Sequence, residues 1–433
     1  MQSSSDSIPV QSHEGPEGQR MRTRASAASL ARRALLFVFD QPPWPLHGNG
    51  VTIRYYPILE ALSTRFDIDV LLLPGDRDTQ IDVADPLRPM LRSVRLVERV
   101  QLSSPRRWLR RIGFWAGYLS PASDPAICHS YEQPELEAAL RKLLARERYD
   151  TVVLVGGKHA ALARRLRGLV ACGTLVVDLI DSLALLVDRG SFGETGAKLR
   201  RLEAQRLRRL ERELARLADR VIYVSRVDAD YANAGAANVS VIPNGVSAAG
   251  LTSEAERLPA RWSVGFFGNM SYWPNVSASA WLAERVMSRV RKTHPDASLA
   301  IIGRDPSSEV RRLAACEGVT VTGAVENIWD YICAVHVCAL PMLEGAGLQN
   351  KVLEAMYAGR PVVTTSIGNE GIDAAPEREI LIADDKEGFA RAIDRLLRDP
   401  GAARRIGEAG RAFARARFSW DRALESFEAV LHG

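Results

Sequence analysis

Short runs of β-branched and other apolar residues alternate along the chain with segments in which apolar positions recur at helical spacing. A first series of apolar runs covers residues 34–40, 66–73, 94–100, 151–155, 174–179, 221–224 and 239–242. A second series covers residues 263–267, 299–302, 319–322, 335–340, 361–365 and 379–382. Helical patterns fill most gaps, for example residues 51–63, 277–293, 348–357 and 386–398. This alternation predicts the α/β class, with parallel sheets covered by helices on both faces.

Two such series predict two Rossmann-like domains, divided by a Pro- and Ser-containing stretch at residues 247–260. We place the N-terminal domain at residues 34–250 and the C-terminal domain at residues 251–415. Residues 1–33 lack an apolar period and are predicted to be a disordered tail. Because ligands of parallel sheets bind at the carboxyl ends of the strands, we expect the site between the two domains.

Composition excludes several classes of protein. The 433 residues exceed one compact core, and 46% hydrophobic with 25% charged residues is ordinary globular composition. No apolar run approaches the ~20 residues of a membrane span, and no secretory leader pattern is present, so we expect a cytoplasmic protein. Five cysteines without a Cys-x-x-Cys pair disfavour a disulfide framework and a thiolate metal site. A net charge of +5 is too small to indicate nucleic-acid binding.

The segment at residues 345–363 (GAGLQNKVLEAMYAGRPVV) combines glycines with a polar helical face. A helix that starts near Leu348 places Asn350, Lys351 and Glu354 on one face. The glycines before it, including Gly347, allow backbone N–H groups to contact an anion at the helix N-terminus. This stripe suits a diphosphate followed by a ribose diol. The alternative is a surface helix with an ordinary Lys/Glu pair. The apolar residues expected to pack on the sheet are Val352, Leu353 and Met356.

Four other segments accompany this one in order: VIPNGV (241–246), VGFFGNMSYWPN (264–275), IGRDP (302–306) and VTGAV (321–325). Together with NKVLEA (350–355), they resemble family 4 of the retaining glycosyltransferases, which have the GT-B fold. The resemblance covers the chain from Ala34 to the C-terminus. The pairing of YWPN with QNKVLEA is similar to sugar transferases associated with bacterial exopolysaccharide loci.

The resemblance implies transfer from a nucleoside-diphosphate sugar with retention of the anomeric configuration, without a cofactor and usually without an essential metal. It implies that Glu354 holds the nucleotide ribose, as the second carboxylate of a Glu-x7-Glu motif. The first carboxylate would fall at Ala346, so the chain departs from the pattern, and Glu344 lies two positions earlier. A final helix, residues 416–433, would pack back across the domain junction.

The diphosphate-binding Arg/Lys pair of this family is not cleanly matched. Asn269 stands where an Arg often follows the glycine, here Gly268. Lys351 and Arg304 are therefore the candidates for the missing positive charge. The alternative for Arg304 is a solvated loop residue after a strand.

The first strand of the N-terminal series leads into a glycine-containing turn, residues 41–52, that is not a G-x-G-x-x-G fingerprint. We expect Gly48, Asn49 and Gly50 to contact the donor phosphate across the cleft, assisted by Arg54 one turn later. The alternative is a simple connection between a strand and a helix.

Two later strand ends carry further candidates. His159 follows a Gly-Gly-Lys turn, where some family members place a histidine that contacts the donor sugar; otherwise it is a structural histidine. Asp178 and Asp181 end the next strand, and either could orient the acceptor hydroxyl or cap a helix. No Ser/His/Asp arrangement indicates hydrolysis.

Two basic segments bear on partners. Residues 103–118 (SSPRRWLRRIGFWAGY) mix arginines with aromatics and could lie on an anionic bilayer, which would suit a lipid-linked acceptor. The alternative is a helix that packs its aromatics inward. In residues 198–220, leucines at 3-4-3 spacing predict a helix with one buried face and no role in nucleic-acid binding.

We therefore expect a glycosyltransferase of the hexosyltransferase type, with an N-terminal acceptor domain and a C-terminal donor domain. Its partners would be a nucleotide sugar and a glycan or lipid-linked acceptor in exopolysaccharide or cell-surface polysaccharide synthesis. The alternatives are a non-catalytic sugar-nucleotide-binding or assembly protein and an epimerase or phosphorylase on a similar scaffold.

Overall fold

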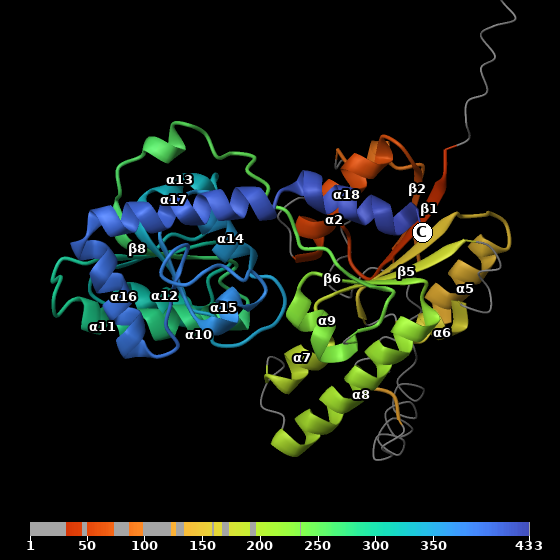
Figure 1. Ribbon diagram of the computed structural model, residues 1–433, viewed down its shortest axis with the longest axis horizontal. Helices are drawn as coiled ribbons and strands as arrows, with labels where there is room; N and C mark the ends of the chain where they lie inside the picture. Colours follow the sequence, from red (N-terminus) through yellow and green to blue (C-terminus); the bar gives the residue numbers. More distant parts are fainter. Residues whose placement is uncertain are drawn as a thin grey trace, which may run out of the picture.

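The computed structural model describes residues 32–45, 50–72, 86–97, 123–126, 134–157, 160–166, 173–190, 196–233 and 235–432. These residues form two α/β domains that lie side by side, each built on its own parallel sheet (Figure 1). Most of the predicted tail and the basic segment at residues 103–118 lie outside the described residues. Within the described ranges, no helix is both long enough and apolar enough to cross a membrane.

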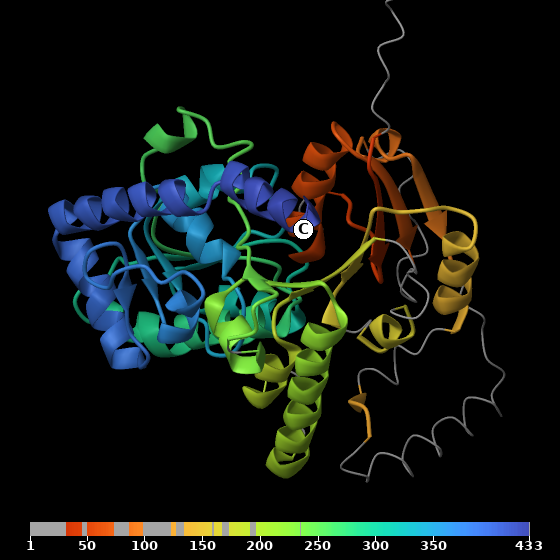
Figure 2. The ribbon, with the colours of Figure 1, turned by 45° about the vertical axis from the view of Figure 1, so that its right-hand side comes forward.

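The N-terminal sheet has seven strands in the order β3-β2-β1-β4-β5-β6-β7, and neighbouring strands run parallel. Its strands are β1 (Ala34–Phe39), β2 (Asp67–Leu72), β3 (Ser93–Leu96), β4 (Thr151–Val155), β5 (Thr174–Ile180), β6 (Arg220–Tyr223) and β7 (Val239–Val241). Its helices are α2 (Gly50–Ser63), α5 (Pro134–Leu144), α6 (Ala160–Leu166), α7 (Leu183–Asp188), α8 (Ala197–Leu217) and α9 (Arg226–Asn233). Helix α8 packs against α7 and α9 and extends beyond the sheet (Figure 2).

The C-terminal sheet has six strands in the order β10-β9-β8-β11-β12-β13, again all parallel. Its strands are β8 (Trp262–Phe267), β9 (Leu299–Ile302), β10 (Val319–Val321), β11 (Val335–Leu340), β12 (Val362–Thr364) and β13 (Leu381–Ile382). Its helices are α10 (Trp273–Trp281), α11 (Met287–Val290), α12 (Ser308–Arg312), α13 (Ile328–Cys333), α14 (Asn350–Tyr357), α15 (Ser366–Glu370), α16 (Lys386–Arg398) and α17 (Pro400–Arg417). A π-helical turn, Leu282–Val286, joins α10 to α11.

The structure confirms the predicted fold class and the predicted strand pattern in both sheets. All five residues of β4 and all four of β9 are buried. Burial on both faces is what parallel strands between two helical layers require, which is why their sequences are continuous apolar runs. On α14 the three apolar residues predicted to pack on the sheet are at most 1% exposed.

The last helix, α18 (Trp420–His432), follows α17 directly and lies on the N-terminal domain against α2 (Figure 1). The buried ring of Phe427 contacts Tyr55 of α2 edge-on, with centroids 6.4 Å apart. The interdomain linker, residues 242–261 between β7 and β8, passes beside the start of α18. A Cβ on Gly245 of this linker would lie 2.5 Å from the Trp420 backbone nitrogen. The linker and α18 therefore cross at a point that admits only glycine.

Arg54 of α2 is buried in the core of the N-terminal domain, with 1% of its surface exposed. Its Nε donates to Asp178 Oδ2 at 2.8 Å, and its Nη1 donates to the Ile242 carbonyl and to Asn244 Oδ1 at 3.0 and 2.8 Å. Tyr55 also donates to Asp178 Oδ2, at 2.7 Å. These contacts correct the expectation that Arg54 assists donor binding, because its guanidinium is enclosed and already used.

The same contacts predict a structural role for Arg54. In Arg54→Met the Asp178 carboxylate remains buried without its cation, so we expect the free energy of unfolding to fall by about 3–5 kcal/mol. Chemical denaturation monitored by circular dichroism measures this change. Arg65→Met is the control, because the Arg65–Glu428 pair lies at the surface and should contribute less than about 1 kcal/mol. Equal losses in the two variants would contradict the assignment.

Candidate functional site

The candidate residues of the C-terminal domain gather at the carboxyl ends of β8, β9 and β11. Gly268 follows β8 with φ +153°, and Gly303 follows β9 with φ +149°. A Cβ on Gly303 would lie 1.7 Å from the Gly268 carbonyl oxygen, so the two strand ends touch through their backbones. The Asn269 side chain accepts from the Ser271 N–H at 2.9 Å and closes the turn after β8.

Lys351 lies in the first turn of α14, which faces these strand ends. Its ammonium donates to Asn275 Oδ1 of α10 and lies 5.3 Å from the ring centroid of Phe266. Glu354 lies one turn later on the same face. Within the described residues neither charge forms an ion pair, with the other or with a third group. The helix thus presents two opposite charges that act on each other at longer range than an ion pair.

Partial burial shifts both groups toward their neutral forms. Desolvation lowers the pKa of Lys351 to about 8, although the nearby Glu354 carboxylate opposes the change. Desolvation likewise raises the pKa of Glu354 to about 7, opposed by the Lys351 ammonium. An anion at Lys351 and hydroxyl donors at Glu354 would each stabilise the charged form. The arrangement therefore suits a ligand that carries both.

The N-terminus of α14 has no side-chain cap, because the Gln349 amide donates instead to the Ala346 carbonyl at 3.1 Å. Its first-turn N–H groups remain oriented for an acceptor. Asn350 accepts from Asn244 Nδ2 at 3.2 Å, so the helix start is tied to the interdomain linker. Arg304, after β9, has 45% of its side chain exposed and lies 3.7 Å from Asp305. The structure places Gly268, Asn269, Asn350, Lys351 and Glu354 at this face, and their role in binding a donor stays a prediction.

On the N-terminal domain, a pocket of about 230 Å³ opens at the carboxyl ends of β1, β4 and β5. Gly50, Gly156 and Gly157 line it together with Asp181. The predicted residues His159, Gly48 and Asn49 lie outside the described residues, so their placement stays a prediction.

Asp181 lies directly beneath the loop that leads into α14. A Cβ on Gly347, which has φ +74°, would be 1.9 Å from Asp181 Oδ1, so only glycine fits here. Burial, and then the Asp228 carboxylate, raise the pKa of Asp181 to about 8, while Arg54 opposes the change. Burial also raises the pKa of Asp228, which accepts hydrogen bonds from the backbone of Ser182 and Gly347. Asp181 can therefore carry its proton at neutral pH.

Further side chains of the N-terminal domain fix this region. Glu211 accepts from the Ser182 hydroxyl and the Ala184 N–H, at 2.8 and 3.0 Å, and so holds the start of α7 after Asp181. Arg189 donates to the Gly345 carbonyl at 3.0 Å and forms an ion pair with Glu370 at 2.6 Å. The N-terminal domain thus contacts the loop before α14 at two points, Gly345 and Gly347.

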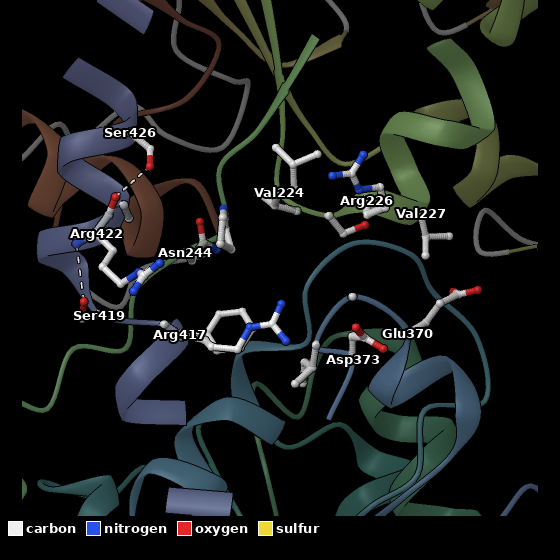
Figure 3. Close-up of a pocket in the computed structure, with 17 residues that line it drawn as sticks. Val224, Arg226, Val227, Asn244, Glu370, Asp373, Arg417, Ser419, Arg422 and Ser426 are labelled. Atoms are coloured by element: carbon white, nitrogen blue, oxygen red, sulfur yellow. Dashed lines mark hydrogen bonds between the residues drawn. The ribbon is translucent and has the colours of Figure 1, made fainter. Parts of the chain in front are cut away.

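A second hollow of about 590 Å³ lies where β6, β7, α15 and α18 meet (Figure 3). Arg226, Arg417 and Arg422 line it, together with Glu370 and Asp373. Its buried polar groups are already engaged, since Asn244 bonds to Arg54 and Asn350, and Ser225 bonds to Asp228. We therefore place the candidate site at α14 and not in this larger hollow. Within the described ranges no cluster of His, Cys, Asp and Glu has metal-binding geometry.

Sequence analysis missed several residues that shape this site. Asn275 and Arg189 contact the site from positions that are distant in sequence, and of these two only Asn275 lies in a segment that sequence analysis singled out. Tyr272 lies in the turn after β8 with 56% of its surface exposed, and desolvation followed by the Asp181 and Glu344 carboxylates raises its pKa. The YWPN segment that contains Tyr272 and Asn275 was the available signal.

Comparisons with known proteins identify the family and the fold of both domains. Residues 49–245 match the family described as "Glycosyl transferase 4-like domain", and residues 261–399 match "Glycosyl transferases group 1". A Klebsiella pneumoniae protein described as "Uncharacterized 44.6 kDa protein in cps region" is 30% identical over 139 residues, which are 30% of this chain and 35% of that protein. The chain thus matches about a third of the length of this relative.

Two solved structures share the fold over nearly their whole length. Sucrose-phosphate synthase from Thermosynechococcus elongatus gives a TM-score of 0.66 at 19% identity, over 93% of this chain and 98% of that one. Anabaena HepE in complex with UDP and glucose gives a TM-score of 0.64 at 17% identity, over 92% of this chain and 99% of that one. With both domains matched by family and fold, the chain belongs to the GT-B glycosyltransferases that join a 4-like N-terminal domain to a group 1 C-terminal domain.

Proposed function

We propose that the protein is a retaining glycosyltransferase that moves a hexosyl group from a nucleoside-diphosphate sugar to a glycan or lipid-linked acceptor in cell-surface polysaccharide synthesis. The observation that carries the proposal is the pair of opposite charges, Lys351 and Glu354, which lie on one face of α14 and form no ion pair within the described residues. The relative in a cps region and the complex of HepE with UDP and glucose support this class of substrate.

The donor would lie along α14. Lys351 and the first-turn N–H groups hold the diphosphate, and Glu354 accepts hydrogen bonds from the ribose hydroxyls. With the positive charge supplied in this way, we expect transfer to need no metal ion. Arg304 after β9 is a second cation within the same set of strand ends.

During transfer, the acceptor oxygen bonds to the anomeric carbon while the bond from that carbon to the diphosphate oxygen breaks. The acceptor proton passes to the departing diphosphate oxygen. Attack from the face that the diphosphate leaves retains the configuration and needs no covalent protein nucleophile. Because negative charge grows on the leaving group, Lys351 stabilises the transition state more than the ground state.

The pocket around Asp181 would receive the transferred sugar and the acceptor hydroxyl. A protonated Asp181 can donate a hydrogen bond to a sugar oxygen, and an ionised one can accept from a hydroxyl. His159 and the turn that contains Gly48 and Asn49 remain proposed contacts on the same side.

The donor roles predict different effects for two substitutions. Glu354→Gln loses the charge that binds the ribose diol, so donor binding should weaken by roughly 1.5–3 kcal/mol. Lys351→Met keeps the aliphatic stem, and its single-turnover rate should fall more than its donor affinity. Calorimetric titration with UDP- and GDP-sugars, followed by single-turnover transfer, measures both quantities.

Matched controls are Lys386→Met and Glu387→Gln, a Lys/Glu pair with exposed side chains in the first turn of α16. Neither control should alter donor affinity. If the donor binds but no glycan or lipid acceptor receives sugar, the non-catalytic alternative replaces ours. A changed sugar nucleotide without acceptor would indicate an epimerase.

Donor affinity should also depend on pH in a defined direction. As pH rises through about 8, Lys351 loses its proton and its attraction for the diphosphate. As pH falls through about 7, Glu354 gains a proton and loses acceptor strength. Titrations between pH 5.5 and 9.5 (chosen to span both values) should give a bell-shaped profile. Lys351→Met should abolish the alkaline limb and Glu354→Gln the acid limb; a flat wild-type profile would exclude both groups from the donor site.

A further inference from the structure

The side-chain amide of Asn275 joins the two motifs that frame the proposed donor site. Asn275 is 4% exposed on α10, in the YWPN segment. Its Oδ1 accepts a hydrogen bond from the Lys351 ammonium of α14. Its Nδ2 donates to the Asn269 carbonyl at 2.8 Å, in the turn after β8. One buried amide therefore connects the turn after one strand to the cation on a helix about 75 residues later.

The orientation of this amide is determined by its partners. The Asn269 carbonyl can only accept a hydrogen bond, so the NH₂ group of Asn275 must face it. The carbonyl oxygen of the amide then faces Lys351, whereas a flipped amide would set NH₂ against an ammonium. Gly268 makes room for this arrangement, because a Cβ there would lie 2.8 Å from Asn275 Nδ2.

The partners of the Lys351 ammonium hold it without neutralising it. Strand β8 offers the ring face of Phe266, and α10 offers the neutral oxygen of Asn275. Glu354, on the same helix as Lys351, is the charged side chain of the described residues that acts on this ammonium. The positive charge is thus fixed in position and still available to an anion.

We propose that Asn275 is a positioning residue that aims the Lys351 ammonium at the donor diphosphate while leaving its charge uncompensated. The inference rests on the proposed function for the identity of the anion. It explains why an amide and not a carboxylate suits position 275: an aspartate of the same shape would pair with Lys351 before any donor arrived.

The direct test measures the titration of Lys351 itself. The chain contains six lysines, so selectively labelled side chains can be followed by NMR, and Lys351→Met assigns the signal. In Asn275→Leu the ammonium loses its polar partner, and the pKa of Lys351 should fall. In Asn275→Asp it gains a counter-ion, and the pKa should rise.

Donor binding should weaken in both variants, while their pH profiles move in opposite directions. With UDP as the probe and GDP in parallel, we expect roughly tenfold weaker binding near neutral pH for Asn275→Leu, and at least as large a loss for Asn275→Asp. The alkaline limb should move to lower pH in Asn275→Leu and to higher pH in Asn275→Asp. Loss of a merely structural contact would move neither limb.

Asn238→Leu is the matched control. The Asn238 amide donates to the carbonyls of Ala215 and Ala218, at 2.7 and 3.0 Å, in the N-terminal domain. Its loss should lower stability but leave the titration of Lys351 unchanged. If Asn275→Leu does not fold, Asn275→Ser tests the predicted fall in the pKa of Lys351, and Asn275→Asp tests the predicted rise.

The inference is overturned if Lys351 titrates in the Asn275 variants as in the wild type, or if their binding losses only equal that of Asn238→Leu. If Lys351 responds as predicted but the wild type binds neither nucleotide, the proposed function fails and the positioning role stands. If nucleotides bind but the titration of Lys351 is unchanged in the Asn275 variants, the positioning role fails and the proposed function stands.

Discussion

The position of α14 in the C-terminal domain depends on one buried guanidinium in the N-terminal domain. Arg54 neutralises Asp178 within the N-terminal core and also binds Asn244 in the interdomain linker. The free side of the Asn244 amide then donates to Asn350, the first residue of α14. Because a guanidinium offers five donors in a rigid plane, it can fix several groups at once. The linker is therefore anchored at the point where it meets α14. The domains cannot shift there without breaking the hydrogen bonds of Asn244 to Arg54 and Asn350.

The two domains contribute different electrostatics to the space between them. The C-terminal domain presents Lys351, helix N–H groups and the Glu354 carboxylate, whereas the N-terminal domain presents Asp181 and Asp228, whose pKa values are raised. A protonated Asp181 adds hydrogen-bonding capacity without repelling an anion. A raised pKa on one side and a half-buried cation on the other are thus compatible with the same bound molecule.

Features that are local in sequence could be predicted, and features that depend on distant partners could not. The strands followed from continuous apolar runs, and the polar face of α14 followed from helical spacing, because both patterns are contained in about ten residues. The burial of Arg54 could also have been predicted, because Arg54 lies four residues before Ile58 on the apolar face of α2. The charge of Arg54 suggested that its side chain faces solvent or a ligand. Its contact with Asp178, which is distant in sequence, explains why it is buried instead. The YWPN segment marked the position of Asn275, but its contact with Lys351 depends on the fold.

Next to the departure at Ala346, the loop before α14 meets a carboxylate of the other domain. Position 346 is 8% exposed and carries no carboxylate, but the next residue, Gly347, lies against the carboxylate of Asp181 from the opposite domain. In a Glu-x7-Glu motif both carboxylates belong to one loop and helix, so their spacing is fixed within one domain. Here the spacing between Asp181 and Glu354 changes whenever the domains move relative to one another. The contacts of Arg189 with Gly345 and Glu370 join the two domains beside this loop, so they help to set the distance between the two carboxylates.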